Sequence, residues 1–292
     1  MVSVSRSFGQ RFRSLRNRLG FRHLLTATLG LVFATILLGV AAKATGSGLA
    51  CQASWPQCDA GPFNLFPASL PSFYEWIHRF VAMFAGFAIL GSGLTAWLSS
   101  SVDSRVAPLV VLGTVLTPVQ VYLGRETVLQ YRMDILSLHF WTAVLIFSLF
   151  TVATVLVWKD ELTARHAAAA LVVGLVTLPL HVALSPTELS VVTEYTPTVQ
   201  LLQYGVTLAL IASVVLATMV ARWRFEGRLT LGILATSVLL ALGVAYLGRR
   251  AVMTFSPTLD QVYVASVVLL AVALLAGIRM SRTVRRRRYQ AG

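Results

Sequence analysis

The sequence predicts an all-α membrane protein in which eight transmembrane helices form two pseudo-symmetric four-helix bundles, with both termini in the cytoplasm. Three observations support this fold. The mean hydropathy is +0.76, and 57% of the residues are hydrophobic while 12% are charged, about half the charged fraction of a soluble domain. Eight stretches lack Asp, Glu, Lys and Arg, and each is close to the ~20 residues that cross the hydrocarbon core as a helix. A short motif also recurs at a constant offset in the two halves.

The eight charge-free stretches define the predicted helices in chain order. They are Leu24–Ala42, Phe80–Val102, Val106–Gly124 and Ile135–Trp158 in the first half, and His166–Thr187, Tyr195–Ala221, Leu229–Gly248 and Gln261–Ile278 in the second. The chain therefore divides into a basic segment (1–22), a first half (23–158), a second half (159–278) and a basic tail (279–292).

The net charge of +13 is concentrated beside the apolar stretches. Six arginines lie between Arg6 and Arg22, and six more between Arg279 and Arg288. This clustering is typical of cytoplasmic flanks in contact with anionic membrane lipid, and it explains the basicity without nucleic-acid binding. We therefore place loops 99–105, 159–165 and 222–228 in the cytoplasm, and loops 43–74, 125–134, 188–194 and 249–260 outside.

The first apolar stretch has an alternative reading as a signal peptide, because Arg22 precedes it and Ala42-Lys43-Ala44 follows it. Its 19 residues exceed the usual length of about 7–15 residues for the apolar region of such a peptide. We therefore expect this stretch to remain as a helix.

An internal repeat relates the two halves. Tyr122-Leu123-Gly124-Arg125 recurs as Tyr246-Leu247-Gly248-Arg249, at an offset of 124, and both copies end the third helix of their half. Because both copies run in the same direction, the two halves are expected to be related by an axis along the membrane normal.

The strongest functional candidates form the segment Glu75-Trp76-Ile77-His78-Arg79, at the outer end of the second stretch. Glu75 and His78 share a helix face, and ionisable groups at membrane depth are functional candidates by default. His139 lies at a similar depth in the fourth helix, so two neutral imidazoles can face each other and ligate haem iron. For a single histidine, a hydrogen-bonded core position would be the simpler interpretation.

Charged residues near this histidine pair suggest further roles. Glu75 either forms an ion pair with Arg79 or is available for proton transfer beside a haem. Arg79, and from the next outer loop Arg125 and Arg132, are candidates for binding haem propionates. His181 lies beside Pro179 and has no partner that the sequence identifies.

The cysteines of the chain, Cys51 and Cys58, lie in the long first outer loop. An oxidising compartment favours a disulfide between them, which would fix the shape of the loop. A redox-active pair is the alternative, although the spacing is not that of the thioredoxin-like motif.

Together these residues resemble the haem A synthase family. The resemblance runs through Ala44-Thr45-Gly46-Ser47-Gly48-Leu49, Cys51, Trp55-Pro56, Cys58, Glu75-Trp76-x-His78-Arg79, Leu123-Gly124-x-x-Thr127-Val128 and His139. It is dense over residues 30–160 and thin afterwards.

The resemblance implies a plasma-membrane oxidoreductase that converts the C8 methyl of haem O to the formyl group of haem A by successive hydroxylation. It implies that His78 and His139 hold the substrate haem and that Glu75 is catalytic. Haem O synthase, an electron acceptor and cytochrome oxidase assembly are the expected partners, and a homo-oligomer is a further expectation.

The second half departs from the family, in which another histidine pair binds a haem b. Gln203 aligns with His78 at offset 125, and Tyr263 aligns with His139 at offset 124. Since neither is a good haem ligand, we expect no bis-histidine haem b there.

Three other functions stay open from the sequence. They are a haem-binding b-type cytochrome without catalysis, a thiol-disulfide oxidoreductase that uses Cys51 and Cys58, and a transporter. The parallel repeat permits a transporter, but we find no helices broken by Gly or Pro at matching depths.

Overall fold

The computed structural model describes residues 20–50, 55, 66–130, 132–224, 228–254 and 256–290. Eight of its helices are long and apolar enough to cross a membrane, which confirms the predicted all-α membrane fold. The helices are α2 (Phe21–Ala44), α3 (Leu70–Leu98), α4 (Ala107–Leu129), α5 (Met133–Val157), α6 (Ala164–Leu184), α7 (Pro197–Arg224), α8 (Arg228–Met253) and α9 (Pro257–Gln290), and a short 3-10 helix η1 (Ser47–Leu49) follows α2.

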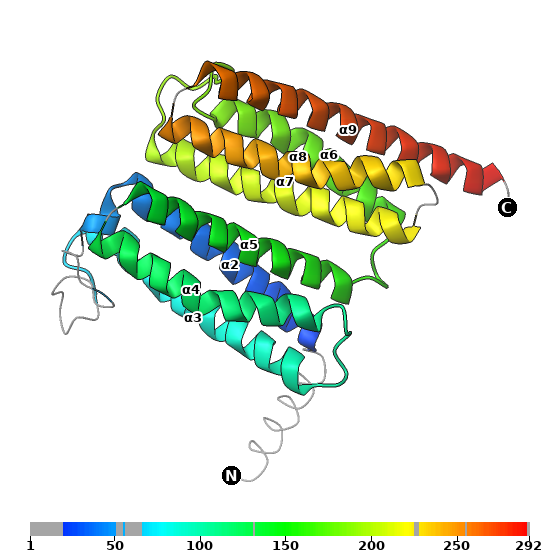
Figure 1. The fold of residues 1–292 in the computed structure, drawn as a ribbon. Coiled ribbons are helices and arrows are strands. Elements are labelled where there is room, and N and C mark those ends of the chain that lie inside the picture. Colours follow the sequence, from blue (N-terminus) through cyan, green and yellow to red (C-terminus); the bar gives the residue numbers. More distant parts are fainter. Residues whose placement is uncertain are drawn as a thin grey trace, which may run out of the picture.

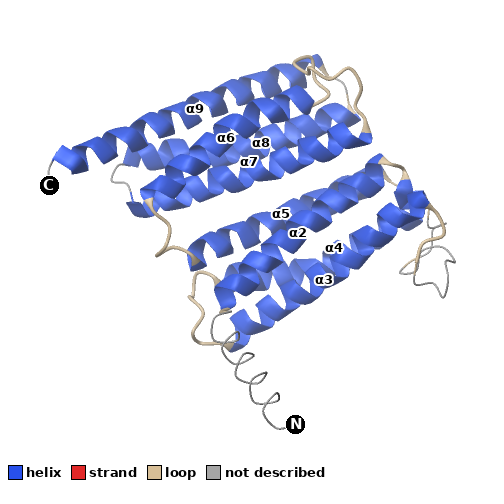
Figure 2. Cartoon of the chain, turned by 180° about the vertical axis from the view of Figure 1, so that it is seen from behind, coloured by secondary structure: helices blue, strands red, loops and turns tan. Residues whose placement is uncertain are grey.

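The helices form two side-by-side groups, α2–α5 and α6–α9 (Figures 1 and 2). Within each group every helix contacts two others in a closed ring, with α2 against α3 and α5 in the first and α6 against α7 and α9 in the second. The groups meet where α7 packs on α2 and α5. Helix α2 begins and α9 ends on the same side of the array (Figure 1).

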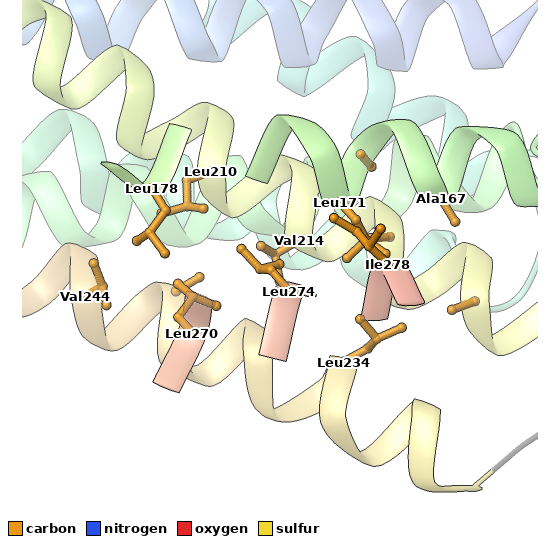
Figure 3. Packing of buried hydrophobic residues seen from close by; sticks show 14 of the residues in the cluster. Ala167, Leu171, Leu178, Leu210, Val214, Leu234, Val244, Leu270, Leu274 and Ile278 are labelled. Carbon is orange, nitrogen blue, oxygen red and sulfur yellow. The ribbon is translucent and has the colours of Figure 1, made fainter. Parts of the chain in front are cut away.

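Each group has its own apolar core. In the second group, Leu171, Leu210, Leu234 and Leu274 come from four different helices, and all are completely buried (Figure 3). The core of the first group also takes in Leu208 and other residues of α7. The second group therefore contributes side chains to the first, and the two share a packed interface.

Helix α3 begins ten residues earlier than the charge-free stretch that predicted it. Ser69 caps its N-terminus by accepting a hydrogen bond from the Ser72 amide, and Pro71 lies in the first turn, where its missing N–H costs no intrahelical hydrogen bond. Glu75, His78 and Arg79 therefore lie within the helix rather than at its mouth.

A buried hydroxyl pair joins α2 to α3. Thr28 Oγ1 and Ser92 Oγ are 3.1 Å apart, and both residues are fully buried. Small polar residues at such a crossing let helices approach closely and hydrogen-bond in a membrane.

Candidate functional site

A cavity of about 690 Å³ opens among the four helices of the first group. This volume lies within the ~300–1,000 Å³ of typical ligand and cofactor sites. Glu75, His78 and Arg79 of α3 and His139 of α5 all line it. The structure thus brings together the histidine pair and the Glu-x-x-His-Arg segment that the sequence singled out.

His78 is held by helix α2. Its Nδ1 lies 3.1 Å from the backbone carbonyl oxygen of Thr35, so the N–H at Nδ1 donates to that oxygen and Nε2 carries the lone pair. Gly39, one turn further along α2, faces the ring, and a Cβ at this position would lie only 2.9 Å from His78 Cε1. A metal-binding histidine usually donates the N–H of one ring nitrogen to a carbonyl or carboxylate oxygen and binds the metal through the lone pair of the other nitrogen.

His139 is arranged in a similar way against α4. Gly124 leaves room for the ring, since a Cβ there would lie 3.0 Å from His139 Cε1. His139 Nε2 is 3.4 Å from the side-chain nitrogen of Gln120. Among the described atoms, His139 Nδ1 and Gln120 Oε1 are buried without a hydrogen-bond partner, and such groups call for an explanation.

The carboxylate of the site is buried and paired. Glu75 is 7% exposed, and its Oε1 accepts a hydrogen bond of 2.9 Å from Arg79 Nε. The ion-pair interpretation of Glu75 is therefore confirmed in geometry. The pair also lines the cavity, so it can act on a bound ligand.

The residues of this cavity fit a haem. Two imidazoles from different helices line the same apolar space, each beside a glycine that leaves room for its ring. The unpartnered His139 Nδ1 is consistent with a ligand between the helices. Such a ligand would be held by His78 and His139, with Arg79 at its edge.

The remaining predicted residues lie elsewhere or outside the described ranges. Arg125 forms an ion pair with Glu126, and Arg132 pairs with Asp134 on the surface; the nearby carboxylate of Asp134 raises the pKa of Arg132. Neither arginine is among the residues that line the cavity, so their contact with propionates stays a prediction. Cys51 and Cys58 are outside the described residues, and their disulfide also stays a prediction.

Sequence reasoning missed several lining residues. Lys43, Gln120, Tyr204 and Arg249 line the cavity, and the last two come from the second group of helices. The repeat contained a signal for Arg249, because Arg249 is the counterpart of Arg125. Tertiary contact between the groups was needed to place it beside the first-half site.

The equivalent interior of the second half is filled by side chains. His181 and Gln203 are each 1% exposed. His181 Nδ1 is 2.7 Å from Thr207 Oγ1, Gln203 Nε2 donates to Ser185 Oγ at 2.8 Å, and Tyr195 donates to Gln203 Oε1. His181 thus has the partners that the sequence did not identify.

The two copies of the repeat place glycine beside histidine in different ways. Gly124 faces His139 of α5, whereas a Cβ on Gly248 would lie 2.8 Å from His181 Nε2 of α6. Tyr263, the counterpart of His139, is 1% exposed and its ring centre lies 6.1 Å from that of His181. Side chains thus occupy the place where a second ligand pair would stand.

Comparison with known proteins relates the chain to heme A synthases over about half its length. It is 30% identical over 139 residues to heme A synthase of Bacillus licheniformis. The matched stretch covers 47% of this chain and 45% of that protein. It is 28% identical over 147 residues to heme A synthase of Geobacillus kaustophilus, 49% of this chain and 45% of that protein. The matched part is thus less than half of each of these relatives.

A second group of relatives has a different name. The chain is 31% identical over 141 residues to protoheme IX farnesyltransferase of Haloarcula marismortui. The matched stretch covers 48% of this chain but 29% of that protein. No family model matches the chain.

Proposed function

We propose that the chain is a haem A synthase-like oxidoreductase of the plasma membrane, which oxidises the C8 methyl of haem O to a formyl group. The observation that carries this proposal is the cavity lined by His78, His139 and the Glu75–Arg79 pair. The relationship to heme A synthases supports the same conclusion. In this proposal residues 23–158 carry the site, and residues 159–278 form a half without a haem b.

The proposed roles follow from the chemistry of the side chains. His78 and His139 hold the substrate haem iron. When the haem binds, Arg79 exchanges its ion pair with Glu75 for a propionate, with Arg125 and Arg132 at the outer rim. Each hydroxylation that takes its oxygen from water releases two protons and two electrons, and loss of water from the second product gives the aldehyde. In this proposal Glu75 accepts a proton, which is supported by its being the carboxylate among the described lining residues, and the electrons pass to an acceptor outside this chain.

The farnesyltransferase relatives suggest a rival activity, transfer of a farnesyl group to haem. A diphosphate substrate usually brings Mg²⁺, which proteins bind through carboxylates. The described lining of the cavity contains a single carboxylate, and Arg79 already pairs with it. We therefore propose that these relatives share a haem-binding module with this chain, rather than its reaction.

The test is to express the chain in cells that make haem O, purify it in detergent, and identify the extracted haem by mass spectrometry. We expect haem O, its hydroxylated form or haem A. His78→Ala and His139→Ala should remove or alter the low-spin haem spectrum. Protein from haem-replete cells that is haem-free and binds no haem on reconstitution would refute the proposal.

Glu75→Gln separates the enzyme from a non-catalytic cytochrome. The amide keeps the shape of the side chain but cannot accept the proton, and general-base catalysis typically contributes about 10²–10⁴-fold. We expect haem binding within about twofold of the unaltered protein and haem A formation reduced by about a hundredfold or more. Unchanged haem A formation would show that Glu75 has another role. Cys51→Ser should leave haem binding intact, whereas a thiol-disulfide enzyme would lose thiol oxidation.

A further inference from the structure

We propose that Arg249 of α8, with Lys43 of α2, forms an anion-binding site at the boundary between the two groups of helices. This site would take a carboxylate of the ligand in the first-group cavity, so that the second half completes the site of the first. The inference rests on the proposed function, in which that ligand is a haem and the carboxylate is a propionate.

Arg249 is buried and incompletely partnered. It is 8% exposed, and its Nη1 donates a hydrogen bond of 2.8 Å to the hydroxyl of Tyr204. The guanidinium carbon lies 4.1 Å from the ring centre of Phe140, which fixes the plane of the group from the first-half side. Among the described atoms, Arg249 Nε has no hydrogen-bond partner. The side chain is therefore held in place with a donor still available.

The charge of Arg249 also lacks a partner within the described ranges. The carboxylates there that form ion pairs do so with other arginines, including Glu75 with Arg79 and Glu126 with Arg125. Lys43 of α2 lines the same cavity as Arg249. Cations at membrane depth are costly unless they are paired, and a bound carboxylate would pair with both.

The repeat shows why Arg249 differs from its counterpart. In the first copy Arg125 is followed by Glu126, with which it pairs, and its side chain is 44% exposed. In the second copy the following residue is Arg250, so the adjacent carboxylate is lost. Arg249 instead turns inward and lines the cavity of the other half.

The position along the helices suits a carboxylate at the edge of a ligand held by the histidines. Gly39 faces His78, and Lys43 is four residues further along α2, about 6 Å of helix rise nearer its end. Arg249 lies four residues before the end of α8, which runs parallel to α2 (Figure 1). Lys43 therefore lies beyond His78 towards the end of α2, Arg249 packs on Phe140 next to His139, and both cations line the same cavity.

The test compares haem with haem dimethyl ester, in which both carboxylates are blocked, by spectrophotometric titration of the purified full chain. We expect the unaltered protein to bind haem at least about tenfold more tightly than the ester, because charge-assisted hydrogen bonds are the strong ones. Arg249→Gln should weaken haem binding about tenfold or more and ester binding less than twofold. Arg249→Lys should give an intermediate value, and the neighbouring Arg250→Gln should resemble the unaltered protein.

The outcomes distinguish the two proposals. Equal binding of haem and ester by a protein that still forms a low-spin haem complex would overturn this inference and leave the proposed function standing. Binding of neither compound would overturn the proposed haem site, and this inference with it. If Arg249→Gln does not fold, the Arg249→Lys variant titrated with haem and with the ester still decides, because a ratio of the two affinities equal to that of the unaltered protein would overturn the inference.

Discussion

Replacing Gly39 by alanine tests whether His78 is a haem ligand without touching the histidine itself. The added Cβ would lie 2.9 Å from His78 Cε1, whereas non-bonded carbons prefer a separation of about 3.5–4.0 Å. The ring must therefore move by roughly 0.6–1.1 Å, the difference between these values. Metal–ligand distances tolerate only about 0.2 Å, so the displacement is several times what ligation allows.

The ring cannot move without loss, because His78 Nδ1 is hydrogen-bonded to the Thr35 carbonyl oxygen at 3.1 Å. Disturbing the groups that orient a metal-binding histidine typically costs about 10–100-fold in metal affinity. We expect a loss of haem affinity in this range for Gly39→Ala, measured by spectrophotometric titration of the purified protein. The low-spin spectrum should also shift or weaken.

Gly30→Ala is the matched control on the same helix, because nothing lies within 4 Å of a Cβ built there. Both substitutions gain the same helix propensity, about 1 kcal/mol in a soluble helix, so this effect cancels in the comparison. If the two variants bind haem with affinities within about twofold of each other, His78 does not ligate the iron and the reasoning is wrong.

Three further predictions concern the packing around the site. Gln203→Ala should lower the free energy of unfolding by about 1–3 kcal/mol, because Ser185 and Tyr195 lose their hydrogen-bond partner. The haem spectrum should stay intact, and a lost haem band would show that the second half holds a ligand. Ser92→Ala should lower the free energy of unfolding by only about 0.6 kcal/mol, since Thr28 keeps its hydrogen bond to a carbonyl oxygen in its own helix. A much larger loss of stability, measured by thermal melting, would contradict this. Burial raises the pKa of the Tyr195 phenol, so its contribution to stability should be complete below the unfolded-state pKa of about 10 and should fall as the pH rises further; Tyr195→Phe should abolish this pH dependence.

The helices could be predicted because a membrane-spanning helix has a simple sequence pattern, a run of about 20 residues without charge. The same criterion misplaced the start of α3, where Glu75 and Arg79 lie inside the helix and face a cavity. Charge marks the end of a span only where the side chain faces lipid or water. A charged residue that lines an internal cavity gives the same local pattern and a different boundary.

The histidine pair could be predicted for a similar reason. The depth of His78 and of His139 in the membrane follows from the number of residues between each histidine and the end of its helix. Gly39 could not, because glycine is frequent in membrane helices and its role depends on which ring lies opposite. Arg249 was missed because its position depends on α8 lying beside residues of the first half, such as Phe140. The sequence does show that Arg250 follows Arg249 where Glu126 follows Arg125. This difference predicts a ligand contact only once the two halves are placed together.

The hydrogen-bonded cluster around His181 and Gln203 bears on which half of the molecule depends on a ligand. Four helices that surround a ligand need something to keep them apart, and in the second half side chains alone do this. The packing of that half therefore needs no ligand. The stability of the first half, with its cavity, should instead depend on the bound ligand, because a ligand that binds the folded state stabilises it.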